Sequence, residues 1–141
     1  MAHLLFVYGH HKRGGKFHDR LGNVRFMGTD FTAPEFTMLE ILPPRLPIVV
    51  ARGRTSIKGE VYALTTDQYN YYLKMENVPL FAVPKTIRTE KNKFIATILV
   101  MSPNLMINSR QFIKTYPIVS TGEYPIEKSY IPALEDGKRG V

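Results

Sequence analysis

Prolines interrupt this chain so often that most of it has no room for long regular elements. Ten of its 141 residues are proline, among them Pro34, the Pro43-Pro44 pair, Pro79 and Pro117. Proline breaks a helix interior and cannot donate to a strand ladder, so the stretches between these positions favour short strands joined by turns. The sequence therefore predicts a fold with little helix.

Short apolar segments with strand-like composition fill most of the intervals between these breaks. They are bounded by glycine, proline, asparagine or other polar residues, as strands are in globular proteins. The polar run from Glu90 to Lys93 predicts a β-hairpin turn, and Arg52-Gly53-Arg54 predicts another turn. The predicted strands cover residues 3–8, 25–33, 35–42, 47–50, 57–64, 82–89 and 94–101.

One segment, Asp67 to Glu76, predicts a helix with a marked beginning and end. Thr66 is the expected N-cap, and a carboxylate in the first turn suits the helix dipole. Asn77 tolerates a left-handed C-cap, and Pro79 forbids continuation. With shorter helices expected at residues 17–21 and 109–116, the pattern predicts an α+β fold: a small mixed β-barrel-like sheet with one main helix packed across it.

Length and composition indicate one globular domain. The chain is 44% hydrophobic and 22% charged, and 141 residues suffice for one core. We expect a single domain over residues 1–141, with a loosely ordered basic tail from about residue 135. No apolar stretch approaches the roughly 20 residues of a membrane-spanning helix, and the opening segment lacks a signal-peptide pattern, so a cytoplasmic protein is expected.

The cysteine count and the charge narrow the choice of partners. With no cysteine, the chain has no disulfides, no thiolate nucleophile and no cysteine-based zinc site. The net charge of +7 suits an anionic partner, but the basic residues are scattered, with one modest cluster at Lys12, Arg13 and Lys16. This distribution favours a solvated basic surface and disfavours nucleic acid and membrane, while an acidic protein partner stays open.

Glu76 occupies an unfavourable place for a carboxylate in the predicted helix. Tyr69, Tyr72, Leu73 and Glu76 are spaced to share one face, the face of the core residues. The carbonyl groups of the last turn also disfavour an anion. Both effects predict a raised pKa for Glu76, toward the range of a general acid/base near neutrality. Alternatively, this side chain turns to solvent or pairs with a nearby lysine.

The histidines lack the spacing of a metal site. His10 and His11 are adjacent, so their side chains point apart, and neither forms a helical His-x-x-x-His pair with His18. Gly14-Gly15 lies among basic residues but lacks the spacing of a P-loop. We therefore predict no metal ion at these histidines.

Three separated motifs resemble the γ-glutamylcyclotransferase-like (AIG2-like) family. The segment from Phe6 to Gly14 resembles its Tyr-Gly-(Ser/Thr)-Leu-x-x-Gly signature after the first strand. The segment from Ile57 to Tyr62 resembles its Val-x-Gly-Glu-Val-Tyr strand, and that from Met75 to Phe81 resembles its Glu-Gly-x-Pro-x-x-Tyr segment. The three occur in the family's order and spacing.

The resemblance implies a pocket between the Tyr-Gly loop and the helix that carries Glu76. Similar proteins cut a γ-glutamyl amide by attack of the substrate's own α-amino group, releasing 5-oxoproline and an amine or amino acid. This would make the protein a cofactor-independent cyclotransferase with Glu76 as general acid/base. The candidate substrate-binding residues are Tyr8, Gly9, His10, His11, Gly14 and Phe81, with Tyr124 and Tyr130 expected at the pocket mouth.

Four positions depart from the family pattern. The mildest is Asn77, which stands where the family has a glycine. His10 and His11 stand where the family has a small hydroxyl residue and a leucine, and Phe81 stands where a tyrosine is usual. The alternative is therefore a catalytically silent member of the same fold, which binds a small ligand or an acidic protein.

Overall fold

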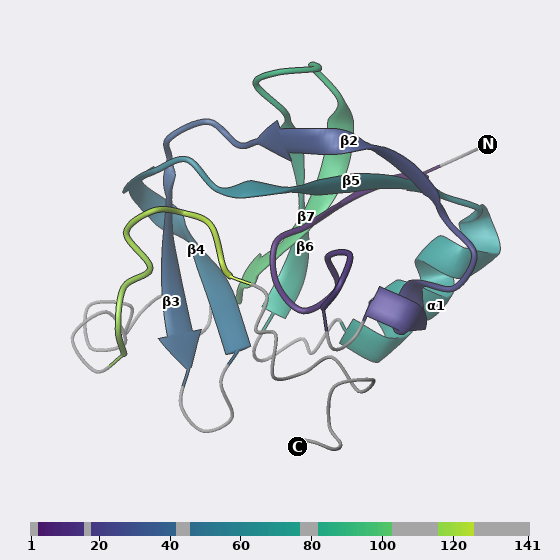
Figure 1. Cartoon of the computed structure of the whole chain (residues 1–141), viewed down its shortest axis with the longest axis horizontal. Coiled ribbons are helices and arrows are strands. Elements are labelled where there is room, and N and C mark those ends of the chain that lie inside the picture. Colours follow the sequence, from purple (N-terminus) through teal and green to yellow (C-terminus); the bar gives the residue numbers. More distant parts are fainter. Residues whose placement is uncertain (1–2, 16–17, 42–45, 77–81, 103–115, 126–141) are drawn as a thin grey trace.

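The computed structural model describes residues 3–15, 18–41, 46–76, 82–102 and 116–125. Most of the predicted elements are present, and the helices are few, as expected (Figure 1). In chain order the elements are β1 (His3–Val7), the 3-10 helix η1 (His18–Leu21), β2 (Arg25–Phe31), β3 (Phe36–Ile41), β4 (Leu46–Thr55), β5 (Lys58–Leu64), α1 (Thr66–Glu76), β6 (Ala82–Arg88) and β7 (Ile95–Met101).

Five strands form a mixed sheet in the order β2-β5-β1-β7-β6. Its central strand, β1, pairs antiparallel with β5 and parallel with β7. Strands β3 and β4 form a separate antiparallel pair, which lies on the other side of the sheet from α1 (Figure 1). The prediction of a mixed sheet with one main helix across it is confirmed, and the described strands do not close into a barrel.

Alternation along β1 explains how one strand serves two cores. Leu5 and Val7 face α1 and pack with Tyr72 of that helix. Phe6 faces the opposite way and packs with Met38 of β3 and other residues of the β3–β4 pair. Successive side chains of a strand point to opposite faces, so a strand covered on both sides has a continuous apolar sequence. Burial of β1 places the start of the following loop, Gly9 and His10, inside the molecule.

Helix α1 begins one residue earlier than predicted. The amide of Gln68 donates to Oγ1 of Thr65 at 3.1 Å, and the amide of Thr65 donates to Oε1 of Gln68 at 2.9 Å. This reciprocal pair is a capping box, and it identifies Thr65 rather than Thr66 as the N-cap. Thr65 and Thr66 are both suitable N-cap residues. Only Thr65 has a glutamine three residues later, Gln68, as a capping box requires. The predicted C-cap, Asn77, and Pro79 lie outside the described residues.

The predicted turn at Arg52-Gly53-Arg54 is wrong, because these residues belong to the long strand β4. Thr37 of β3 pairs with Val50, but its neighbour Phe36 pairs with Thr55, so the intervening residues of β4 bulge out of the ladder. Gly53 has a φ of +136° within this bulge. A side chain there would collide with Thr37. The glycine thus permits a bulge rather than a turn.

The predicted β6–β7 hairpin is confirmed, and a carboxylate from another strand holds its turn. Asp30 of β2 is fully buried. It accepts hydrogen bonds from the amides of Lys91 at 2.8 Å and Asn92 at 3.0 Å, from the Asn92 side chain at 3.0 Å, and from the amide of Phe31 at 2.8 Å. Burial alone would raise the pKa of Asp30, but the backbone donors outweigh it and lower that pKa.

Three predictions remain, namely two short helices and the basic tail. The short helix expected at residues 17–21 is present as η1, while the helix expected at 109–116 and the basic tail lie almost wholly outside the described residues. Within the described ranges, no helix has the length and apolar character needed to span a membrane.

Candidate functional site

A cavity of about 240 Å³ lies where β1 ends. Its walls come from β1 and the loop after it, from β4, from α1, and from single residues of β6 and β7. They are mostly apolar, with two imidazole rings. The described residues that line the cavity are Phe6, Val7, Tyr8, Gly9, His10, His11, Leu46, Pro47, Ile48, Tyr72, Met75, Ala82 and Leu99.

The loop after β1 forms two successive turns. The amide of Lys12 donates to the carbonyl of Gly9 at 3.1 Å, and the amide of Gly15 donates to the carbonyl of Lys12 at 2.8 Å. A Cβ on Gly9 would lie 2.6 Å from Cγ of Pro47, so only glycine lets the loop approach β4 this closely. Gly14, with a φ of +81°, supports the second turn, but it does not line the cavity.

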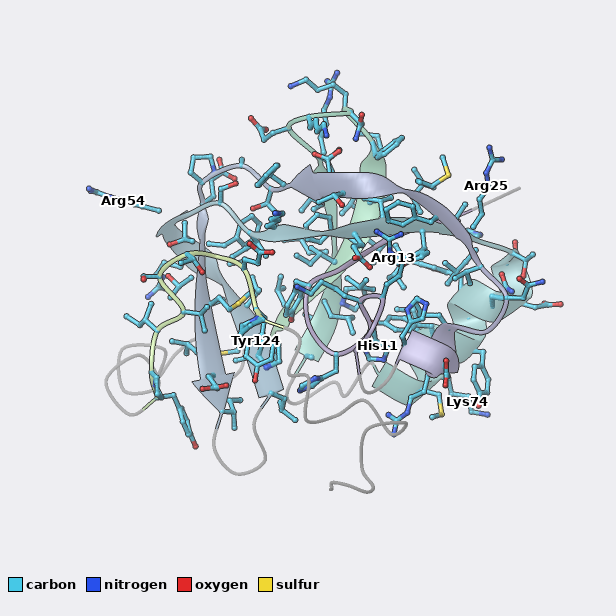
Figure 2. All side chains as sticks on the ribbon, in the orientation of Figure 1. His11, Arg13, Arg25, Arg54, Lys74 and Tyr124 are labelled. Carbon is cyan, nitrogen blue, oxygen red and sulfur yellow. The ribbon has the colours of Figure 1, made fainter. Side chains whose placement is uncertain are left out.

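Both predicted imidazoles reach the cavity wall. The ring of His10 is buried and meets the ring of Tyr124 edge-on, with 5.4 Å between centroids. The ring of His11 meets Tyr72 of α1 in the same manner at 5.2 Å. Figure 2 shows Tyr124 and His11 to the two sides of the loop after β1. The loop is thus held between α1 and the segment that contains Tyr124.

Tyr8 presents its ring to the cavity while its hydroxyl group is engaged elsewhere. The hydroxyl donates to the carbonyl of Leu99 at 2.9 Å and accepts from the amide of Val49 at 3.4 Å. Burial raises the pKa of Tyr8, so the phenol stays protonated. These bonds tie β1 to β7 and β4, which is a structural role for the hydroxyl.

Replacing Tyr8 by phenylalanine should lower the free energy of unfolding by about 1 to 2 kcal/mol, because buried strand groups lose a partner. Urea unfolding followed by circular dichroism measures the change. The matched control is Tyr71→Phe, since the Tyr71 side chain is 58% exposed. Equal stability of the two variants would show that the Tyr8 hydroxyl does not support the sheet.

The end of α1 lies at the cavity. Tyr72 and Met75 line it, and Glu76 is the next residue and the last of the helix. The structure therefore brings together the loop and the helix end that the sequence motifs predicted. The side chain of Glu76, and all of Phe81 and Tyr130, lie outside the described residues. The predicted helix face is present in Tyr69, Tyr72 and Leu73, which pack against the sheet.

Tyr124 contacts the loop from behind and is not among the residues that line the cavity. Its side chain is buried, and its hydroxyl donates to Oε2 of Glu40 on β3 at 2.6 Å. Its carbonyl accepts from Nζ of Lys12 at 2.6 Å.

The sequence predicted that Lys12 belongs to a solvated basic cluster. This prediction is wrong, because the Lys12 side chain is buried. Only 7% of its surface is exposed, because the loop folds back and directs its side chain inward. Burial lowers the pKa of Lys12, although the carboxylates of Glu123 and Glu60 act in the opposite direction. The residues next to Lys12 in the sequence, including the exposed Gly14, give no indication that the lysine is buried.

Glu60 fixes the other side of the loop and was not predicted as part of the site. Its Oε1 accepts from the amide of Arg13 at 2.8 Å and from the hydroxyl of Tyr62 at 2.9 Å. Its Oε2 lies 3.6 Å from Nε of Arg13. Burial, reinforced by Glu60, raises the pKa of Tyr62. The Gly-Glu-Val-Tyr motif was the available signal, because its glutamate lies on the strand beside the loop.

No group of three His, Asp or Glu side chains in the described ranges is arranged to hold a metal ion. His11 and His18 do lie close together, but through the carbonyl of His11, which is 2.8 Å from Nδ1 of His18. This contact links the loop to η1.

The sequence also matches a known family. The model of the allophanate hydrolase C-terminal domain family matches residues 3–103, which include the loop, β5 and α1. The chain belongs to this family. No curated protein matches it.

Solved structures with the same fold include AIG2-like proteins. An AIG2-like protein from Mus musculus has a TM-score of 0.67 and 16% identity, over 88% of each chain. The protein c4763 of uropathogenic E. coli has a TM-score of 0.68 and 16% identity, over 87% of this chain and 92% of its own. The predicted resemblance to AIG2-like proteins is thus confirmed, and at these identities it concerns the fold.

The same fold also occurs inside a larger enzyme. A variant of the allophanate hydrolase from Kluyveromyces lactis has a TM-score of 0.69 and 17% identity over 96% of this chain, but over only 22% of the enzyme. The fold of this chain therefore also occurs as one part of a longer enzyme.

Proposed function

We propose that this protein is a cyclotransferase that cleaves a γ-glutamyl amide and releases 5-oxoproline. The observation that carries the proposal is the cavity between the loop after β1 and the last turn of α1, the turn that ends at Glu76. AIG2-like proteins share the fold that builds this cavity. Its volume of about 240 Å³ is many times what a single water molecule needs, so the cavity has room for a small amino-acid-like ligand.

In the proposed reaction, the α-nitrogen of the substrate forms a bond to its own side-chain carbonyl carbon. The bond between that carbon and the leaving nitrogen then breaks, giving 5-oxoproline and an amine or amino acid. Glu76 takes the proton from the α-amino group and returns it to the leaving nitrogen. Backbone amides between Gly9 and His11 stabilise the charge on the carbonyl oxygen. Both reacting groups belong to one molecule, so positioning supplies much of the acceleration.

The test is incubation of the purified protein with γ-glutamyl amines, γ-glutamyl amino acids and γ-glutamyl-ε-lysine, with 5-oxoproline measured by mass spectrometry. Each substrate is paired with its N-acetyl derivative, in which the attacking nitrogen is blocked. We expect 5-oxoproline only from the free amines. Cleavage of an N-acetyl derivative to N-acetylglutamate would instead indicate hydrolysis by water.

One observation favours a second candidate function, a catalytically silent binding domain. His10 and His11 place imidazoles in the cavity wall where the γ-glutamylcyclotransferase-like signature has a small hydroxyl residue and a leucine. In that case a γ-glutamyl compound, or an acidic protein drawn by the net charge of +7, binds without turnover. Isothermal titration with 5-oxoproline and γ-glutamyl compounds, in the absence of product formation, would identify this function. A cytoplasmic location belongs to both proposals.

A further inference from the structure

Lys12 is a buried lysine in the loop whose residues Gly9, His10 and His11 line the cavity. Lysine is almost never buried unless its ammonium group has a partner, and here Nζ lies 2.6 Å from the carbonyl oxygen of Tyr124. The two residues are 112 positions apart in the chain. The contact therefore joins the loop after β1 to a segment near the other end of the described residues.

The backbone of Lys12 is at the centre of the same loop. Its amide donates a hydrogen bond to the carbonyl of Gly9, and its carbonyl accepts a hydrogen bond from the amide of Gly15. Any displacement of Lys12 therefore moves both turns. His10 and His11, the two imidazoles of the cavity wall, lie between Gly9 and Lys12.

The segment that receives the lysine is fixed independently of the loop. The amide of Val119 donates to the carbonyl of Met38, and the amide of Lys58 donates to the carbonyl of Gly122, each at 2.9 Å. The Tyr124 hydroxyl donates to Glu40 on β3. The segment 116–125 is therefore a firm support, and it lies beyond residue 103, where the family match ends.

We propose that Lys12 is a positioning residue, which uses the Tyr124 carbonyl to hold His10, His11 and the neighbouring amides in the shape that the cavity requires. The edge-on contact between the rings of Tyr124 and His10 acts in the same direction. Lys12 does not line the cavity, so its effect is exerted through the loop. The kinetic part of the proposal rests on the proposed cyclotransferase function.

The kinetic experiment compares Lys12→Met with Lys91→Met, which removes one positive charge from an exposed side chain. Misplacement by about 1 Å can lower a rate by about 100-fold, so kcat should fall up to that far in Lys12→Met with little change in KM. Lys12→Arg, which keeps a charged donor, should recover part of kcat. Equal kcat values in Lys12→Met and Lys91→Met would overturn the proposal.

A second measurement does not depend on catalysis. Nuclear magnetic resonance of the histidine ring protons should show the His10 and His11 signals shifted in Lys12→Met, whereas His3, stacked on Tyr69 at the other end of β1, should be unchanged. If the wild type makes no 5-oxoproline, the cyclotransferase function fails, and these signals alone decide the role of Lys12. Unchanged His10 and His11 signals would refute it.

If Lys12→Met does not fold, the variant Tyr124→Phe tests the positioning role of Lys12 instead. This variant keeps the ring and the carbonyl but loses the bond to Glu40, so the support for Lys12 loosens. We expect a smaller shift of the His10 signal in the same experiment. A His10 signal identical to that of the wild type would count against the proposal.

Discussion

Changing Glu76 to glutamine should lower kcat for 5-oxoproline release by about 100- to 10,000-fold, the usual contribution of a general acid/base. Glutamine keeps the size of the side chain but cannot take up or return the proton. Substrate contacts remain, so KM should change by no more than a few-fold. Steady-state kinetics with the best γ-glutamyl substrate gives both constants.

The matched control for this variant is Glu35→Gln, which removes the same charge from an exposed side chain before β3. Its kcat should equal that of the wild type. Titration of 5-oxoproline into Glu76→Gln should show retained binding, which would exclude unfolding as the cause of lost turnover. Full turnover in Glu76→Gln would rule out this residue as the acid/base.

The largest effect on stability is expected for Asp30→Asn. The side chain keeps its volume, but it turns an NH₂ group, itself a donor, toward backbone N–H donors that then lack an acceptor. Each buried donor left without an acceptor costs about 1 to 3 kcal/mol, so we expect a loss of about 3 kcal/mol and a fall in Tm of about 10 °C. Calorimetry measures both, with Asp19→Asn on the exposed start of η1 as control.

The pH dependence provides a second test of Asp30. The pKa of this carboxyl is lowered in the folded protein, below the value of about 3.9 in an unfolded chain. Its stabilising contribution is therefore complete at neutral pH and is lost as the pH falls below about 4. The difference in stability between wild type and Asp30→Asn should shrink from pH 6 to pH 3. A constant difference would mean that hydrogen-bond geometry, not ionisation, determines the effect.

Local patterns were sufficient to predict most elements of the fold. The apolar faces of β1 and α1 and the polar turn between β6 and β7 are properties of neighbouring residues, and periodicity reports them directly. Gly53 shows the limit of such reasoning. Glycine permits turns and bulges alike, and only the pairing of β4 with β3 decides which occurs.

The sequence motifs cover the loop after β1 and the end of α1, which line one cavity, but they do not reveal the residues that support the loop. The motifs identified the loop after β1 and the end of α1, because each is a contiguous run of residues. Lys12 gave no such signal, since the carbonyl group that its side chain contacts lies 112 positions away. A polar residue is exposed by default, and its burial follows from tertiary contacts that the sequence does not display.

The central position of β1 has a consequence for biosynthesis. This strand precedes both of its neighbours, since β5 begins at Lys58 and β7 at Ile95. At about 5 to 20 residues per second, a ribosome needs roughly 4 to 18 s to pass from the end of β1 to the start of β7, during which the apolar faces of β1 await cover. The nascent chain is then open to chaperones, and Tyr8 gains its hydrogen bond to the carbonyl of Leu99 only after β7 has emerged.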